Sequence, residues 1–111
     1  MNLSRKIAWH AAVAIAAGLL VFPAVSLADD ASAGLFKTKC AGCHGADGKG
    51  ETTMGKTLKL RDLASADVQK QSDDELTTII TVGKNKMPPY GKSLSADQVK
   101  GLVGYVRSLK K

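Results

Sequence analysis

The stretch Cys40-Ala41-Gly42-Cys43-His44 decides the interpretation of this chain. Two cysteines three positions apart, with a histidine directly after the second, form the attachment motif of a c-type haem. The two thiols add to the two vinyl groups of one haem as thioethers, and the histidine then lies below the iron as its proximal ligand. These are the only two cysteines in 111 residues. The motif therefore predicts one covalent haem c on Cys40 and Cys43, with its iron on His44.

Two other chemistries use a cysteine pair at this spacing. A thioredoxin-like redox disulfide lies next to a βαβ pattern, and this sequence has no strand-like alternation. A structural zinc site needs four cysteine or histidine ligands, and the only other histidine is His10, near the N-terminus. Haem is therefore the better interpretation of the motif.

The N-terminal segment has the pattern of a secretory signal. Arg5 and Lys6 are basic, residues 7–25 are mostly apolar, and no acidic residue occurs before Asp29. Small residues precede the predicted cleavage site after Ala28. An uncleaved membrane anchor is the alternative, because the apolar run approaches the roughly 20 residues of a spanning helix.

Cleavage divides the chain into a signal peptide, residues 1–28, and one small exported domain, residues 29–111. We expect the periplasm, with the thylakoid lumen or secretion as alternatives, since haem is attached outside the cytoplasm, where unligated thiols tend to oxidise. The domain keeps three aromatic residues, Phe36, Tyr90 and Tyr105. Such a core is thin, so a covalent haem would supply much of the buried apolar surface.

The composition is moderately basic, with 16 Lys and Arg against 10 Asp and Glu and a net charge of +6. The chain lacks the recognition motifs of nucleic-acid-binding proteins. It also has no Ser-His-Asp set, no paired carboxylates and no metalloprotease helix, so we expect no enzyme activity. A lysine-rich surface either attracts acidic partner proteins or only keeps a small protein in solution.

Apolar spacing and capping residues predict an all-α domain of helices joined by loops. A first helix leads into Cys40, and a glycine-rich loop covers residues 45–55. Ser65 is expected to cap a short turn, and capping boxes at Ser72–Glu75 and Ser95–Gln98 begin two further helices. The last helix places five apolar residues on one face: Val99, Leu102, Val103, Val106 and Leu109.

Two glycines, Gly101 and Gly104, lie inside this last helix, where each costs about 1 kcal/mol relative to alanine. The pair indicates a close crossing with another helix. The N-terminal helix, which carries Gly34 and Phe36, is the natural partner. Simple tolerance of glycine explains the pair equally well.

The iron face opposite His44 has two candidate ligands, Met54 and Met87. Met54 follows His44 by only ten positions, so the chain would have to cross the haem edge in a strained, extended form. Met87 precedes Pro88 and Pro89, which fix φ and stiffen the loop. A stiff loop keeps a weak thioether ligand on iron. We therefore predict Met87 as the distal ligand and Met54 as a gap-filling apolar side chain.

Nearly all of residues 29–111 resembles the small class I bacterial monohaem cytochromes c. The resemblance lies in the attachment region Cys40–Gly50 with Phe36 before it, in the methionine loop Val82–Tyr90, and in Leu102 and Tyr105. It implies a cytochrome c domain whose N- and C-terminal helices cross, with short helices and loops wrapped around one covalent haem. In this family, an aromatic of the last helix packs against the first.

The chain departs from that pattern at two places. Ser32 stands where many relatives have glycine. No proline occurs between Gly45 and Met87, although in many relatives a proline carbonyl accepts the hydrogen of the histidine Nδ1. Another carbonyl is then expected to accept it, and such a bond sets the basicity of the ligand.

With His44 and Met87 both on iron, a six-coordinate haem leaves no position for a substrate. The sequence therefore predicts a soluble electron carrier that passes one electron between redox protein partners, at a potential raised by the methionine. The alternative is a haem-based ligand binder or gas sensor with a displaceable methionine. We expect a monomer without a stable membrane span after cleavage. The resemblance places five lysines around the exposed haem edge, facing acidic partners: Lys37, Lys39, Lys84, Lys86 and Lys92.

Overall fold

The computed structural model describes residues 16–20 and 27–111, and in this part of the chain it has helices and no β-strand. The predicted signal peptide falls mostly on residues 1–15 and 21–26, which lie outside the described residues. The helices are α1 (Leu27–Lys39), α2 (Ala41–His44), α3 (Thr53–Leu58), α4 (Ala66–Gln69), α5 (Asp73–Val82) and α6 (Ala96–Ser108). Because α1 begins at Leu27, the predicted cleavage site after Ala28 lies in its first turn.

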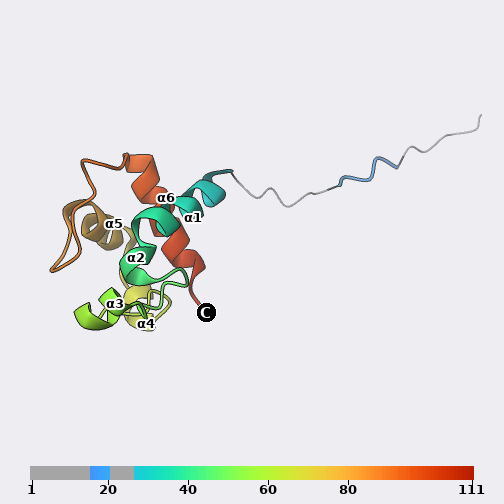
Figure 1. The fold of residues 1–111 in the computed structure, drawn as a ribbon. Helices are drawn as coiled ribbons and strands as arrows, with labels where there is room; N and C mark the ends of the chain where they lie inside the picture. Colours follow the sequence, from blue (N-terminus) through green and yellow to red (C-terminus); the bar gives the residue numbers. More distant parts are fainter. Residues whose placement is uncertain (1–15, 21–26) are drawn as a thin grey trace, which may run out of the picture.

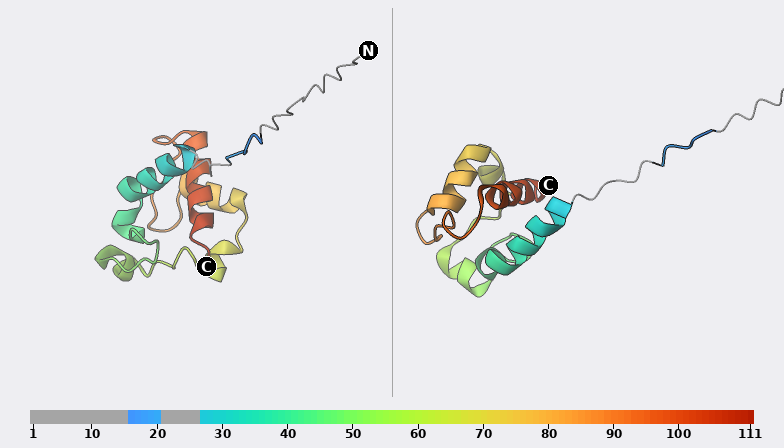
Figure 2. Two further views of the ribbon diagram at one scale, coloured as in Figure 1. Left: turned by 90° about the vertical axis from the view of Figure 1, so that its right-hand side faces the viewer. Right: turned by 90° about the horizontal axis from the view of Figure 1, so that it is seen from above.

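The first and last helices, α1 and α6, cross each other, with α5 packed against α6 (Figure 1). Figure 2 shows the same crossing from two further sides. At the crossing, Phe36 of α1 and Leu102 of α6 are only 3% and 2% exposed. The Phe36 and Tyr105 rings lie 4.7 Å apart between centroids. The predicted contact of the terminal helices through Phe36, Leu102 and Tyr105 is therefore confirmed.

Close approach of the two helices explains one of the two glycines in α6. A Cβ atom on Gly101 would overlap the hydroxyl of Ser32, which is buried in α1. No atom lies within 4 Å of a Cβ placed on Gly104 or Gly34. The predicted close crossing is confirmed at Gly101 and wrong at Gly104. The chain thus places its small α6 residue opposite Ser32.

The two predicted capping boxes are confirmed at the starts of α5 and α6. Ser72 Oγ accepts the Glu75 N–H at 3.0 Å, and the Glu75 carboxylate accepts the Ser72 N–H at 2.9 Å. Ser95 and Gln98 exchange the equivalent bonds at 3.1 and 2.9 Å. These boxes satisfy backbone donors that the first helical turn leaves open. The predicted apolar face of α6 is buried except at Leu109, which lies after the helix and is half-buried.

Two local predictions were wrong. The glycine-rich loop is shorter than expected, because α3 begins at Thr53: the Thr52 hydroxyl accepts the Gly55 N–H at 2.8 Å and so caps a helix that contains a glycine. Ser65 does precede the short helix α4, but its side chain makes no capping bond. The Ser65 Oγ is buried without a hydrogen-bond partner.

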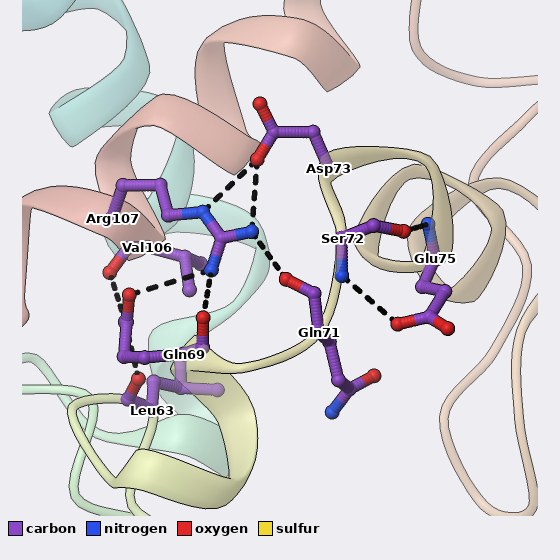
Figure 3. Close-up of polar contacts among 8 residues, drawn as sticks. All are labelled: Leu63, Gln69, Gln71, Ser72, Asp73, Glu75, Val106 and Arg107. Atoms are coloured by element: carbon purple, nitrogen blue, oxygen red, sulfur yellow. Dashed lines mark hydrogen bonds and ion pairs between the residues drawn. The ribbon is translucent and has the colours of Figure 1, made fainter.

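Sequence reasoning missed a polar cluster that fastens the end of α6 to the connection between α4 and α5 (Figure 3). This Arg107 cluster consists of Arg107, Gln69, Gln71 and Asp73. The guanidinium donates to the Asp73 carboxylate at 3.0 Å and to the backbone oxygens of Gln69, at 2.8 Å, and Gln71. The Gln69 amide donates to the Leu63 and Val106 carbonyls at 2.8 and 2.9 Å. The cluster therefore fixes the segment 63–73, which forms one wall of the cavity described next.

Candidate haem-binding site

A cavity of about 340 Å³ lies between the helices and the loop after α5. Its wall is largely apolar and includes six side chains of the buried core: Phe36, Val68, Leu76, Ile80, Leu102 and Val106. Cys40, Cys43, His44 and Met87 also line it. The hydrophobic core of the domain is thus built around a space that is also lined by the four predicted haem-binding residues, Cys40, Cys43, His44 and Met87.

The attachment motif faces the cavity because it is wound as a helical turn. The Cys40 N–H bonds the Phe36 carbonyl at 2.8 Å and continues α1, and the His44 N–H bonds the Cys40 carbonyl at 2.9 Å as α2 forms. Residues three and four positions apart share one face of a helix. Cys40, Cys43 and His44 therefore present two sulfurs and one imidazole to the same space.

Burial shifts the pKa of two groups in this turn. Both cysteines are free thiols. Burial, and after it the charge of Cys43, raises the pKa of the Cys40 thiol. Burial lowers the pKa of His44, so its imidazole is held in the neutral form that binds a metal.

His44 departs from expectation at its second nitrogen. The Nδ1 atom is buried and has no hydrogen-bond partner, whereas the sequence led us to expect a carbonyl acceptor in place of the missing proline. The His44 carbonyl accepts the Gly50 N–H at 2.7 Å, and the Gly45 carbonyl accepts the Gly48 N–H at 3.0 Å. The Phe36 ring lies 6.4 Å from the imidazole between centroids.

The two methionine candidates lie in different environments. Met87 is half-buried and lines the cavity. Met54 lies in α3, is 49% exposed and does not line the cavity. The structure thus brings Met87 together with the attachment motif and leaves Met54 at the surface, so the prediction that Met54 fills a buried gap is wrong.

The loop that carries Met87 has a defined backbone. Lys84 and Met87 exchange backbone hydrogen bonds of 3.2 and 2.9 Å. Gly83, which ends α5, has φ +84°, and a Cβ there would come within 2.6 Å of the Met87 carbonyl oxygen. Only glycine satisfies both conditions without strain. Further along, the Tyr90 and Gly91 N–H groups donate to the Ile80 and Thr81 carbonyls of α5 at 2.9 and 3.0 Å.

Tyr90 is one of the three aromatic residues of the domain and part of the methionine loop, but its sequence position alone did not predict a role in the site. It lines the cavity, and its hydroxyl donates to the Lys39 carbonyl at 3.3 Å. Burial, followed by the charges of Cys40 and Cys43, raises the pKa of this phenol. Its position directly after Met87-Pro88-Pro89 was the signal available in the sequence. Five cationic residues also line the cavity: Lys39, Lys59, Arg61, Lys84 and Lys86.

Comparison with known proteins identifies the class. Residues 28–106 match the family described as "Cytochrome C oxidase, cbb3-type, subunit III". The chain is 41% identical over 83 residues to cytochrome c6 of Rippkaea orientalis, covering 73% of this chain and 72% of that protein. It is 33% identical over 104 residues to cytochrome c6 of Nostoc sp., covering 92% and 91%. The solved "KustC0563 c-type cytochrome" superposes with a TM-score of 0.67 and 36% identity, over 72% of this chain and 98% of that one.

The chain therefore belongs to the cytochrome c family, as a small monohaem class I member with the all-α cytochrome c fold. Members of this class carry a covalently bound haem c with iron, and the cavity supplies a donor set that fits it: two free thiols, a neutral imidazole and a thioether within apolar walls. The class is one of electron carriers. Within the described residues, none of the helices has the length and apolar character needed to cross a membrane.

Proposed function

We propose that this cytochrome passes single electrons between redox proteins through a haem c whose iron is held by His44 and Met87. The observation that carries the proposal is that Cys40, Cys43, His44 and Met87 line one apolar cavity. When bound, the haem supplies a couple between Fe(II) and Fe(III). The chain would contribute the two axial ligands of the iron and the apolar walls around the haem.

Each ligand has a separate role in this proposal. Cys40 and Cys43 fix the haem as thioethers on one helical turn. His44, neutral because it is buried, would be the proximal ligand. Met87, on a loop stiffened by Pro88 and Pro89, would be the distal ligand, and its thioether would raise the potential by favouring Fe(II). Two protein ligands would leave no position for a substrate or gas, which favours a carrier over a haem-based ligand binder.

Exchange of either methionine tests the distal ligand. In Met87→Ala we expect a high-spin or water-ligated ferric iron, loss of the iron–sulfur absorption band near the red end of the spectrum, and a lower reduction potential. Met54→Ala is the matched control, because it removes the same thioether from an exposed position. It should leave spectrum and potential unchanged. The reverse pattern would show that Met54 is the ligand.

The proposal also includes a place and a partner. The basic, apolar N-terminal segment supports export to the periplasm or a lumen and removal of residues 1–28. We propose that the exported domain is a monomer. The basic surface supports partners with acidic docking faces. Lys84 and Lys86 are exposed at the cavity itself, where electrons would enter and leave.

A further inference from the structure

Tyr90 joins three separate parts of the domain. Its N–H donates to the Ile80 carbonyl of α5 at 2.9 Å. Its carbonyl accepts the Leu94 N–H at 2.9 Å and the Ser93 N–H at 3.1 Å, in the turn that leads to α6. Its hydroxyl donates to the Lys39 carbonyl, 51 positions earlier in the chain, at 3.3 Å.

The hydroxyl bond joins two residues that line the cavity, Tyr90 and Lys39. Lys39 is the last residue of α1 and directly precedes Cys40, the first cysteine of the attachment motif. Tyr90 lies three positions after Met87 and is separated from it by two prolines. Among the hydrogen bonds of the described residues, this is the one that joins the methionine loop, residues 83–91, to the end of α1.

The other hydrogen bonds of the loop do not connect it to α1. Those between Lys84 and Met87 close the loop on itself, and those from Tyr90 and Gly91 tie it to α5. Met87 and Tyr90 also pack against the hydrophobic core, but without the Tyr90 hydroxyl bond no hydrogen bond would oppose movement of the loop away from the end of α1. The prolines between Met87 and Tyr90 restrict φ, so displacement of the tyrosine is transmitted to the methionine.

We propose that Tyr90 is a positioning residue that latches the methionine loop to the attachment helix and so keeps Met87 on the iron. This inference rests on the proposed function, since it assumes that Met87 is the distal ligand. The phenol acts through Met87, by opposing the loop displacement that an incoming ligand requires.

Competition with imidazole measures the latch directly. The ferric haem-loaded proteins, native and Tyr90→Phe, are titrated with imidazole while the iron–sulfur absorption is followed. Phenylalanine keeps the ring and removes only the hydroxyl. Because a net hydrogen bond that opposes opening is lost, we expect Tyr90→Phe to bind imidazole about two- to tenfold more tightly. Tyr105→Phe is the matched control, since the structure gives that hydroxyl no hydrogen bond and places the ring against Phe36.

The outcomes separate the latch from the ligand. Tighter imidazole binding in Tyr90→Phe, with Tyr105→Phe equal to the native protein, supports the latch. Equal affinities in all three proteins, with the iron–sulfur band intact, overturn the latch and leave the proposed function standing. Equal gains in both variants also overturn it, because they indicate general loosening of the fold. A native protein without the iron–sulfur band overturns the proposed ligation, and the latch with it.

Discussion

Phe36 connects the helix crossing with the haem cavity at the scale of a single residue. Its ring is 3% exposed, packs on Tyr105 at 4.7 Å between centroids and lies 6.4 Å from the His44 ring. It also lines the cavity. One side chain thus helps to hold α1 against α6 and also lies beside His44, whose Nδ1 has no hydrogen-bond partner.

Removal of this ring should be costly. We expect Phe36→Ala to lower the free energy of unfolding of the haem-loaded protein by about 3–5 kcal/mol, through lost apolar burial and the cavity left behind. Val82→Ala, at a side chain 67% exposed, should change it by less than about 0.5 kcal/mol. Denaturant titration of both variants measures the difference. A loss below about 1 kcal/mol for Phe36→Ala would contradict the role assigned to the ring.

Local sequence patterns predicted much of the candidate site. The spacing of Cys40, Cys43 and His44 requires a helical turn, and the prolines after Met87 distinguish it from Met54. The Tyr90 and Arg107 bonds were not predictable, because each joins a side chain to backbone carbonyls 36 to 51 positions away. Such partners are set by how the helices pack, and no local pattern encodes them.

At the scale of the element, only one of the two glycines in α6 lies in close contact with α1. A Cβ on Gly101 overlaps the Ser32 hydroxyl, whereas one on Gly104 points into open space. Both glycines carry the same cost in helix propensity relative to alanine. Helix propensity therefore cannot explain the presence of both glycines. Of the two positions, only Gly101 requires glycine for the helices to cross this closely.

The matched pair Gly101→Ala and Gly104→Ala separates packing from propensity. Gly101→Ala should lower the free energy of unfolding by about 1–3 kcal/mol, because the helices must move apart or Ser32 must shift. Gly104→Ala should raise it by up to about 1 kcal/mol, since alanine stabilises an exposed helical position. Thermal or denaturant unfolding of the two haem-loaded variants gives both values. A gain in both would mean that the helices are not in close contact at Gly101.

At the scale of the whole molecule, cationic side chains gather around the cavity. Lys39, Lys59, Arg61, Lys84 and Lys86 line the cavity, so positive charge gathers where the haem would approach the surface. A field of this kind steers an acidic partner toward the site of transfer. Lysines placed for solubility alone would act equally wherever they lie on the surface.

The rate of electron transfer to an acidic redox protein distinguishes electrostatic steering from a role in solubility alone. The second-order rate of the native cytochrome should fall as ionic strength rises, because salt at about 0.15 M shortens the reach of exposed charges to roughly 8 Å. The double variant Lys84→Glu, Lys86→Glu should be slower at low salt and much less sensitive to salt. Lys110→Glu, Lys111→Glu changes the net charge equally at exposed residues that do not line the cavity, so it should retain most of the native dependence. If the two double variants behave alike, net charge alone accounts for the steering, and the face at Lys84 and Lys86 has no special role.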